Sequence, residues 1–264
     1  MKTGFIGCGN MATAMVRGIL KGKKAKPEEI LVSRRHVEPL QQLQEELGIG
    51  ITTDNKEVAA FADVLFLAVK PQFYAETIQE IRDAVGENTI VVSIAPGKTL
   101  NWLEEQFGGP MKIVRTMPNT PAMVGEGMMG ICPGATVTKE ELEAVRELCS
   151  GFSRTEIVTE NLMDVVVSVS GSAPAYVFMF IEAMADAAVE QGMPRAQAYK
   201  FAAQAVMGSA KMVLETGKHP GELKDMVCSP AGTTIKAVRV LEKEGLRSAV
   251  IEAMDACVDA AKGM

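Results

Sequence analysis

Short apolar runs alternate with amphipathic stretches over the first 158 residues of the chain. The runs have the length and β-branched content of buried strands, and the stretches between several of them carry apolar residues at helical spacing. This alternation predicts an α/β fold with a doubly wound, mostly parallel sheet. We expect strands at 2–6, 30–33, 64–69, 89–94, 112–116, 128–132 and 155–158, and helices at 37–47, 73–85 and 139–150.

The pattern changes after Asn161, where the β-rich runs end and long helical stretches follow. Gly192 and Gly217 stand at positions typical of helix C-caps. We therefore expect an all-helical second part, with residues 1–160 in one domain and residues 161–264 in the other. Its helices are expected at 161–169, 174–191, 194–216, 221–227, 233–244 and 246–262.

The helix expected at 174–191 is apolar over most of its circumference. Its charges Glu182, Asp186 and Glu190 recur every four residues and form one narrow stripe. Such a helix must be buried on several sides, and a domain of about 100 residues offers little depth for that. The sequence therefore predicts an obligate homodimer that packs through its helical halves.

Composition restricts the function classes. The chain has 264 residues, is 47% hydrophobic and carries a net charge of −6, so it is typical of a globular protein and poorly suited to binding nucleic acid. We find no apolar run that approaches the roughly 20 residues of a membrane span, and the N-terminus leads directly into a strand. We expect neither nucleic acid nor membrane as a partner.

Cysteine and histidine usage argues against several kinds of active site. The five cysteines lack CxxC spacing, so we expect buried free thiols in a reducing cytoplasm and no metal site. His36 and His219 lie in polar stretches that we expect to be exposed, so a histidine-based catalytic dyad is not predicted. The cysteines are Cys8, Cys132, Cys149, Cys228 and Cys257.

A glycine pattern follows the first expected strand and leads into a helix. Gly7, Gly9 and Ala12 occupy the G-x-G-x-x-G/A positions of a dinucleotide-binding loop. In such a loop the first glycine permits the tight turn, the second lets the pyrophosphate approach the backbone, and the third residue keeps helix and strand close. A plain βα turn is the alternative, but the flanking strand and helix favour a dinucleotide site.

The second expected strand indicates which dinucleotide is preferred. An NAD site of this type usually has an acid at the end of that strand for the ribose 2′-OH. Here the strand ends in Ser33, Arg34 and Arg35, a hydroxyl and two guanidinium groups that suit a 2′-phosphate. We therefore expect NADPH, with NADH also possible; the alternative is that both arginines are solvated loop residues.

Three more strand ends carry rigid turns with exposed backbone groups, at residues 68–71, 93–97 and 115–121. Because ligands of doubly wound sheets bind outside the carboxyl ends of the strands, these turns predict a cofactor-lined edge.

One segment of the helical half, residues 228–237, concentrates hydroxyl groups at a helix start. An ordinary helix start, with Thr233 or its neighbour as N-cap, accounts for one hydroxyl but not for three. Free N–H groups at a helix N-terminus also attract an anion such as a substrate carboxylate. Spacing alone leaves the two interpretations equal.

Five segments together resemble the pyrroline-5-carboxylate reductase family, and they extend through essentially the whole chain. The segment at residues 4–11 is shared with several dehydrogenase families, whereas Ser-Pro-Ala-Gly-Thr-Thr at residues 229–234 is close to diagnostic. The resemblance implies NAD(P)H-dependent reduction of 1-pyrroline-5-carboxylate to L-proline, an N-terminal Rossmann domain and a C-terminal helical dimerisation domain. It also implies further assembly, since many members form decamers. The segments are residues 4–11, 68–71, 115–121, 171–176 and 229–234.

By position, the resemblance implies that Thr234 is catalytic, with its hydroxyl beside the imine nitrogen. It also implies that Ser229, Gly232, Thr233 and Thr234 bind the substrate. Some members have Gly-Gly-Ala-Thr here, which puts a side-chain role of Thr233 in doubt. The residues implied for the cofactor are Ile6, Gly7, Cys8, Gly9, Asn10, Met11, Ser33, Arg34, Arg35, Asn55, Ala68, Val69, Lys70, Pro71, Ala95, Gly97, Met117, Pro118 and Asn119.

Two other functions are alternatives to imine reduction. A 3-hydroxyacid or 6-phosphogluconate-type dehydrogenase uses a lysine on the first long helix of its second domain, and residues 172–191 contain none. A non-catalytic NADP(H)-binding regulator is disfavoured by the intact segment 229–234. An imine substrate is already electrophilic and needs mainly positioning, which agrees with the scarcity of histidines.

Overall fold

The computed structural model describes residues 1–263 and divides the chain into two compact units. The first comprises Met1–Ser172 together with the C-terminal residues from Cys257, and the second comprises Ala173–Ala256. Compactness therefore divides the chain after Ser172. The functional division after residue 160 stays a prediction.

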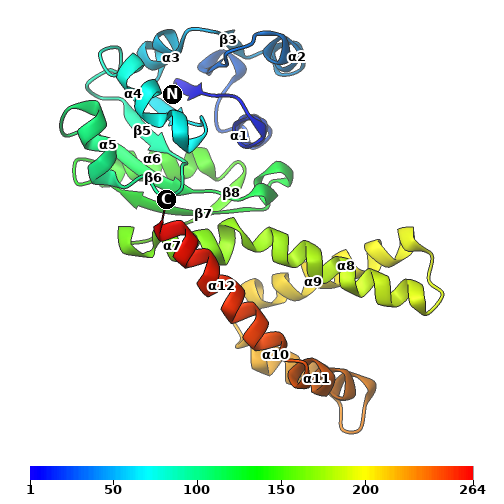
Figure 1. Ribbon diagram of the computed structural model, residues 1–264. Helices are drawn as coiled ribbons and strands as arrows, with labels where there is room; N and C mark the ends of the chain where they lie inside the picture. The colour runs from blue at the N-terminus through cyan, green and yellow to red at the C-terminus, as the bar shows by residue number, and fades with distance from the viewer. Residues whose placement is uncertain (264) are drawn as a thin grey trace. The chain divides into compact units, whose positions relative to one another are not determined.

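The first unit is built around one eight-stranded sheet with the strand order β3-β2-β1-β4-β5-β6-β7-β8. Most of this unit is coloured from blue to green in Figure 1. All neighbouring strands pair in parallel except β6 and β7, which are antiparallel. The predicted α/β fold with a doubly wound, mostly parallel sheet is confirmed. The strands are β1 Thr3–Ile6, β2 Ile30–Ser33, β3 Gly50–Thr52, β4 Val64–Leu67, β5 Ile90–Ser93, β6 Ile113–Met117, β7 Gly127–Pro133 and β8 Ser153–Ile157.

Helices cover both faces of this sheet because successive strand residues point to opposite sides. In β1, Phe5 packs into a core with α1, α2 and α6, whereas Ile6 packs into a second core with α3, α4 and α5. The ring of Phe5 stacks on Phe66 of β4, with centroids 4.6 Å apart. The helices are α1 Asn10–Lys21, α2 Glu38–Leu47, α3 Asn55–Phe61, α4 Tyr74–Ile81, α5 Leu100–Phe107, α6 Lys139–Cys149 and α7 Met163–Val166.

Strand β3 and helices α3 and α5 were not predicted from the sequence. β3 has three half-buried residues, and α3 and α5 are only seven and eight residues long, so none of the three gives a clear periodic signal. The expected helix at 161–169 is also interrupted. It begins with a 3₁₀ turn and, after α7, widens into a π-helical turn at Val167–Gly171.

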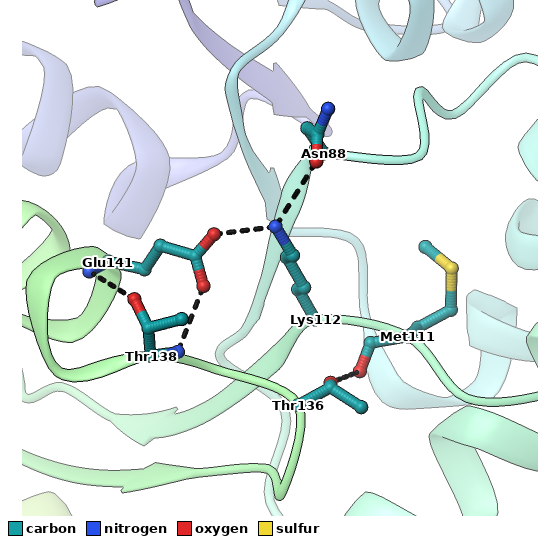
Figure 2. A network of polar contacts seen from close by, with 6 residues as sticks. All are labelled: Asn88, Met111, Lys112, Thr136, Thr138 and Glu141. Atoms are coloured by element: carbon teal, nitrogen blue, oxygen red, sulfur yellow. Dashed lines mark hydrogen bonds and ion pairs between the residues drawn. The ribbon is translucent and has the colours of Figure 1, made fainter.

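A polar network anchors α6 to the start of β6 (Figure 2). Thr138 and Glu141 form a reciprocal capping box at the helix N-terminus. The Lys112 ammonium donates to Glu141 at 2.6 Å and to the Asn88 side chain at 3.3 Å. The hydrogen bond from Lys112 is the main cause that lowers the pKa of Glu141. The network thus ties the helix start to a strand on which the site depends.

The second unit is all-helical within the described residues, as predicted. Helices α8 and α9 pack against each other. Gly217 adopts the left-handed conformation at the end of α9, as expected for a C-cap glycine. The helices are α8 Ala173–Glu190, α9 Arg195–Thr216, α10 Pro220–Val227, α11 Thr233–Lys243 and α12 Leu246–Lys262, and the last residues of α12 belong to the first unit.

Helix α8 leaves most of its apolar surface uncovered by its own chain. Only Ala185 is buried, whereas Phe178 and Met179 are 62% and 70% exposed. The helical stretch Glu160–Glu190 is long and apolar enough to cross a membrane by length and composition. The expectation that no run approaches this length is therefore wrong. The stretch from 165 to 181 carries no charge, but small residues interrupt its large apolar side chains.

The described cysteines are free thiols, but they are not all buried as expected. Cys8, Cys132 and Cys149 are buried, whereas Cys228 and Cys257 are half-buried. The Cys257 thiol lies 3.3 Å from the Ser172 hydroxyl in the first unit.

Candidate cofactor site and substrate-binding turn

The glycine loop joins the ends of three neighbouring strands. The Gly7 amide donates to the Ser33 carbonyl at the end of β2, and the Ala68 amide, after β4, donates to the Ile6 carbonyl. Gly7 has a φ of +89°, and a Cβ there would lie 2.8 Å from the Ala68 backbone. Only glycine allows this turn, because a side chain would clash with the Ala68 backbone and the positive φ would be strained.

Helix α1 begins directly after the loop and presents its N-terminus to the same edge. Gly9 is the N-cap residue, no side chain caps the helix, and its first turn contains no acid. A Cβ on Gly9 would meet no protein atom within 4 Å. The space over Gly9 is therefore open, and the uncapped N–H groups are suited to bind an anion such as a pyrophosphate.

A pocket of ≈ 570 Å³ opens at this edge of the sheet. It brings together nine of the residues that the sequence assigned to the cofactor. Six further residues line it that the sequence analysis did not single out for the cofactor. The predicted lining residues are Gly7, Cys8, Gly9, Arg34, Arg35, Asn55, Ala68, Val69 and Lys70, and the additional ones are His36, Thr53, Phe73, Glu76, Thr77 and Glu80.

The end of β2 gives the pocket a basic wall. Arg34 and Arg35 are exposed, and one Arg34 nitrogen lies 3.4 Å from the Cys8 carbonyl oxygen. The guanidinium of Arg35 lies 4.6 Å from the centroid of the Phe73 ring. Two cations at a strand end that lacks an acid are suited to a 2′-phosphate.

Ser33 lies differently from expectation. Its side chain is fully buried, and its hydroxyl donates to the Asn55 side-chain oxygen at 2.7 Å. In this arrangement Ser33 orients Asn55 rather than offering its hydroxyl to the pocket.

Tyr74 is a buried side chain that positions this edge and that the sequence analysis did not identify. Its hydroxyl donates to the Leu67 carbonyl at the end of β4 and accepts from the Ile94 amide after β5. Burial raises the pKa of Tyr74 to about 12. The phenol therefore stays protonated and links two strand ends instead of serving as an acid or base.

The other predicted cofactor residues lie outside this pocket. The side chains of Ile6, Ala95, Pro118 and Asn119 are buried, so a ligand could reach these positions only through the backbone. Besides Ser33, the predicted residues outside the pocket are Ile6, Asn10, Met11, Pro71, Ala95, Gly97, Met117, Pro118 and Asn119.

Asn119 has a structural role in the first unit. Its amide nitrogen donates to the Ser170 carbonyl at 3.1 Å, and its oxygen accepts from the Met128 amide at 2.9 Å. A Cβ on Gly171 would lie 2.8 Å from the end of the Met117 side chain. The loop after β6 is thus fitted closely to the π-helical turn.

Arg115 of β6 is a buried cation that two half-buried acids neutralise. Arg115 is 4% exposed and pairs with Glu160 at 3.1 Å and Asp164 at 3.7 Å. Glu160 also accepts from the Leu100 amide at 2.7 Å. Removing the acids is costly because the charge of Arg115 stays buried.

The second cluster of predicted residues lies in the other unit, at the start of α11. The Gly232 amide donates to the Ser229 carbonyl and closes a turn, in which Ala231 has a φ of +58°. Gly232 is the N-cap residue, and no side chain caps α11. Thr233 is exposed and Thr234 is half-buried. The turn therefore presents uncapped N–H groups and three hydroxyls, the features expected of a carboxylate site.

Neither cluster is built for metal chemistry, and the glycine loop is not built for thiol catalysis. Among residues 1–263, no three His, Cys, Asp or Glu side chains are grouped to hold a metal ion. Burial raises the pKa of the Cys8 thiol in the glycine loop. The thiol is therefore uncharged near neutral pH and does not repel a phosphate.

The fold and the glycine-loop pocket define an NAD(P)-dependent oxidoreductase. The family model "NADP oxidoreductase coenzyme F420-dependent" matches residues 2–97, and "Pyrroline-5-carboxylate reductase dimerisation" matches residues 160–264. The chain belongs to the pyrroline-5-carboxylate reductase family: it is 54% identical to pyrroline-5-carboxylate reductase of Escherichia coli, over 98% of this chain and 96% of the relative. The resemblance found in the sequence is confirmed.

Solved structures agree with this assignment. A pyrroline-5-carboxylate reductase from Coxiella burnetii superposes with a TM-score of 0.92 at 36% identity, covering 99% of this chain and 97% of that one. Plasmodium falciparum pyrroline carboxylate reductase with NADP bound gives a TM-score of 0.90 at 30% identity, covering 100% and 97%. The expected NAD(P)H cofactor is thereby supported, as is a dimerisation domain in the second half.

The two loop glycines allow a test of where the pyrophosphate binds. Gly9→Ala should fold like the wild type, since its φ is −90° and its Cβ would meet no protein atom. It should weaken NADPH binding at least about tenfold, because the methyl group occupies the phosphate approach. NADPH titration by fluorescence, with a thermal melt, measures both effects.

Gly7→Ala is the matched control. Its positive φ and its contact with Ala68 should lower the melting temperature by several degrees, because left-handed strain costs about 1–2 kcal/mol before any clash is counted. Unchanged NADPH affinity in Gly9→Ala would show that the pyrophosphate does not lie over Gly9.

Proposed function

We propose that this protein reduces 1-pyrroline-5-carboxylate to L-proline with NADPH, the last step of proline biosynthesis. The observation that carries the proposal is the uncapped start of α11, flanked by Ser229 and Thr234, in a chain 54% identical to a reductase of that name. A helix start without a side-chain cap is a ready site for the carboxylate of such a substrate.

The cofactor is assigned to the pocket at the sheet edge. The glycine loop and the start of α1 hold the pyrophosphate, Arg34 and Arg35 hold the 2′-phosphate, and Ala68 to Pro71 border the adenosine. Backbone at Ala95, Gly97 and Met117 to Asn119 is assigned to the nicotinamide side. NADPH is the preferred donor and NADH a weaker one, because the basic wall pairs with a phosphate that NADH lacks.

Substrate binding is assigned to the turn before α11. The N–H groups at Gly232 to Thr234 and the Ser229 hydroxyl bind the carboxylate, and the Thr234 hydroxyl lies beside the ring nitrogen. When bound, NADPH supplies the hydride that reduces the carbon of the C=N bond. The nitrogen takes up one proton as it becomes the amine of proline, and Thr234 orients that nitrogen or passes the proton. The protein therefore acts mainly by positioning.

The functional division is placed after residue 160, so that residues 1–160 bind the cofactor and residues 161–264 bind substrate and dimerise. The family match that begins at residue 160 supports this boundary. The free cysteines of the described chain support a reducing compartment, and we assign the protein to the cytoplasm.

Turnover with the substrate tests the activity directly. The purified protein should oxidise NADPH when given 1-pyrroline-5-carboxylate and release L-proline, identified by mass spectrometry. The kcat/KM with NADPH should exceed that with NADH at least about tenfold, the effect of one charge-assisted contact to the 2′-phosphate. Absence of turnover with both cofactors would overturn the proposal.

Thr234→Ala tests the role of the hydroxyl. We expect kcat/KM for the imine to fall about ten- to hundredfold, as for a lost hydrogen bond to a charged group, with NADPH affinity nearly unchanged. Thr233→Ala should lose less, because its side chain has no assigned role. Wild-type kinetics in Thr234→Ala would remove this residue from the mechanism.

Quaternary structure follows from the apolar surface of α8. We propose a homodimer formed through the helical half, with further assembly into a decamer as the family resemblance implies. Sedimentation at micromolar concentration should give a dimer or a larger even multiple. A monomer at that concentration would contradict the dimer, and a species that stays dimeric would contradict the decamer.

A further inference from the structure

The pocket wall formed by α4 carries two carboxylates to which the assignment above gives no role. Glu76 and Glu80 lie one helical turn apart and both line the cofactor pocket. The lining after β2 carries Arg34 and Arg35. The pocket therefore holds carboxylates as well as cations, and the carboxylates are suited to a ligand group that donates hydrogen bonds.

Glu80 differs from an ordinary surface acid because it is held in place. The Asn55 amide nitrogen donates to a Glu80 carboxylate oxygen at 2.8 Å, and the Asn55 oxygen accepts from the buried Ser33 hydroxyl at 2.7 Å. Since a carboxylate only accepts, the amide nitrogen must face Glu80, which fixes the orientation of Asn55. The chain of contacts from Ser33 thus holds the carboxylate at the pocket.

The order of the cofactor's parts places the base against this wall. The pyrophosphate is assigned to the glycine loop, and the 2′-phosphate to the basic wall. The base is attached to the same ribose, so the lining that remains for it is His36, Thr53 and the wall on α4 and just before it, and only the α4 wall carries carboxylates. Phe73, stacked under Arg35, offers a flat surface there, and Thr77 and Glu80 follow along the helix.

We propose that Glu80 accepts a hydrogen bond from the 6-amino group of the cofactor's adenine. A carboxylate has about four lone-pair positions, so the single bond to Asn55 leaves acceptor capacity for the base. At position 6 adenine carries an amino group that donates N–H bonds, whereas hypoxanthine carries a carbonyl oxygen, an acceptor that repels the carboxylate. Glu80 is then a specificity-determining residue for adenine. The inference rests on the proposed NADPH site.

The hypoxanthine analogue of NADPH, in which a carbonyl replaces the 6-amino group, tests this role. Dissociation constants are measured by cofactor fluorescence without substrate. The wild type should bind NADPH about tenfold more tightly than the analogue, the effect of one hydrogen bond to a charged group. In Glu80→Gln this ratio should fall to one or below, because the amide oxygen that accepts from Asn55 leaves the amide nitrogen, a donor, for the base.

The choice of glutamine separates base recognition from positioning. The Gln carbonyl can still accept from Asn55, so the orientation of that amide is retained. Glu76→Gln removes the neighbouring acid of the same wall and should keep the tenfold ratio. Glu80 is exposed, so both variants should melt like the wild type.

Three results would overturn the inference. A wild-type ratio near one would show that the 6-amino group is not recognised, and a tenfold ratio retained in Glu80→Gln would assign recognition to another group. If the ratio were retained while both dissociation constants rose by the same factor in Glu80→Gln, Glu80 would act only as a support for Asn55. Because binding is measured without substrate, failure of imine reduction with intact NADPH binding would count against the proposed function alone.

Discussion

The cofactor site depends on one close backbone contact, that of Gly7 with the chain that follows β4. The contact is possible because Gly7 adopts a φ of +89° and has no Cβ to meet Ala68. Through it the ends of β1, β2 and β4 meet, with the Gly7 amide on the Ser33 carbonyl and the Ala68 amide on the Ile6 carbonyl. Only with these ends together can the glycine loop, the basic wall and helix α4 line one pocket. The neighbouring strand ends are tied by the Tyr74 hydroxyl, which bridges Leu67 and Ile94.

The sequence predicted those strands whose side chains form an uninterrupted buried run. β2 and β4 are such runs, and their side chains are buried along the whole strand. β3 was missed because an edge strand of three half-buried residues leaves no comparable pattern. The π-helical turn Val167–Gly171 could not be predicted either. It is fitted to distant residues, namely Asn119 through the Ser170 carbonyl and Met117 against Gly171, and local periodicity does not report such contacts.

The site was predictable where the backbone forms it and less so where side chains do. The glycine pattern depends on local sterics, and Gly7, Cys8 and Gly9 line the pocket as expected. The Ser33 hydroxyl instead faces Asn55, because the start of α3 lies over the end of β2. Glu76, Thr77 and Glu80 share a helical face, and in a sequence a polar helical face is typical of solvent exposure. Their placement in a pocket depends on the tertiary position of α4, so this part needed the structure.

The stretch from Glu160 to Glu190 shows why apolar composition alone does not determine the role of a helix. Its first part is packed inside the sheet-containing unit, where Met163, Val167 and Ser168 are buried and Asp164 pairs with Arg115. Its second part, α8, belongs to the other unit and exposes Phe178 and Met179. A single membrane span would have to remove the first part from a packed core and strand the buried charge of Arg115. The dimerisation family model covers this helix, which supports the proposed homodimer as the cover for the exposed apolar surface of α8.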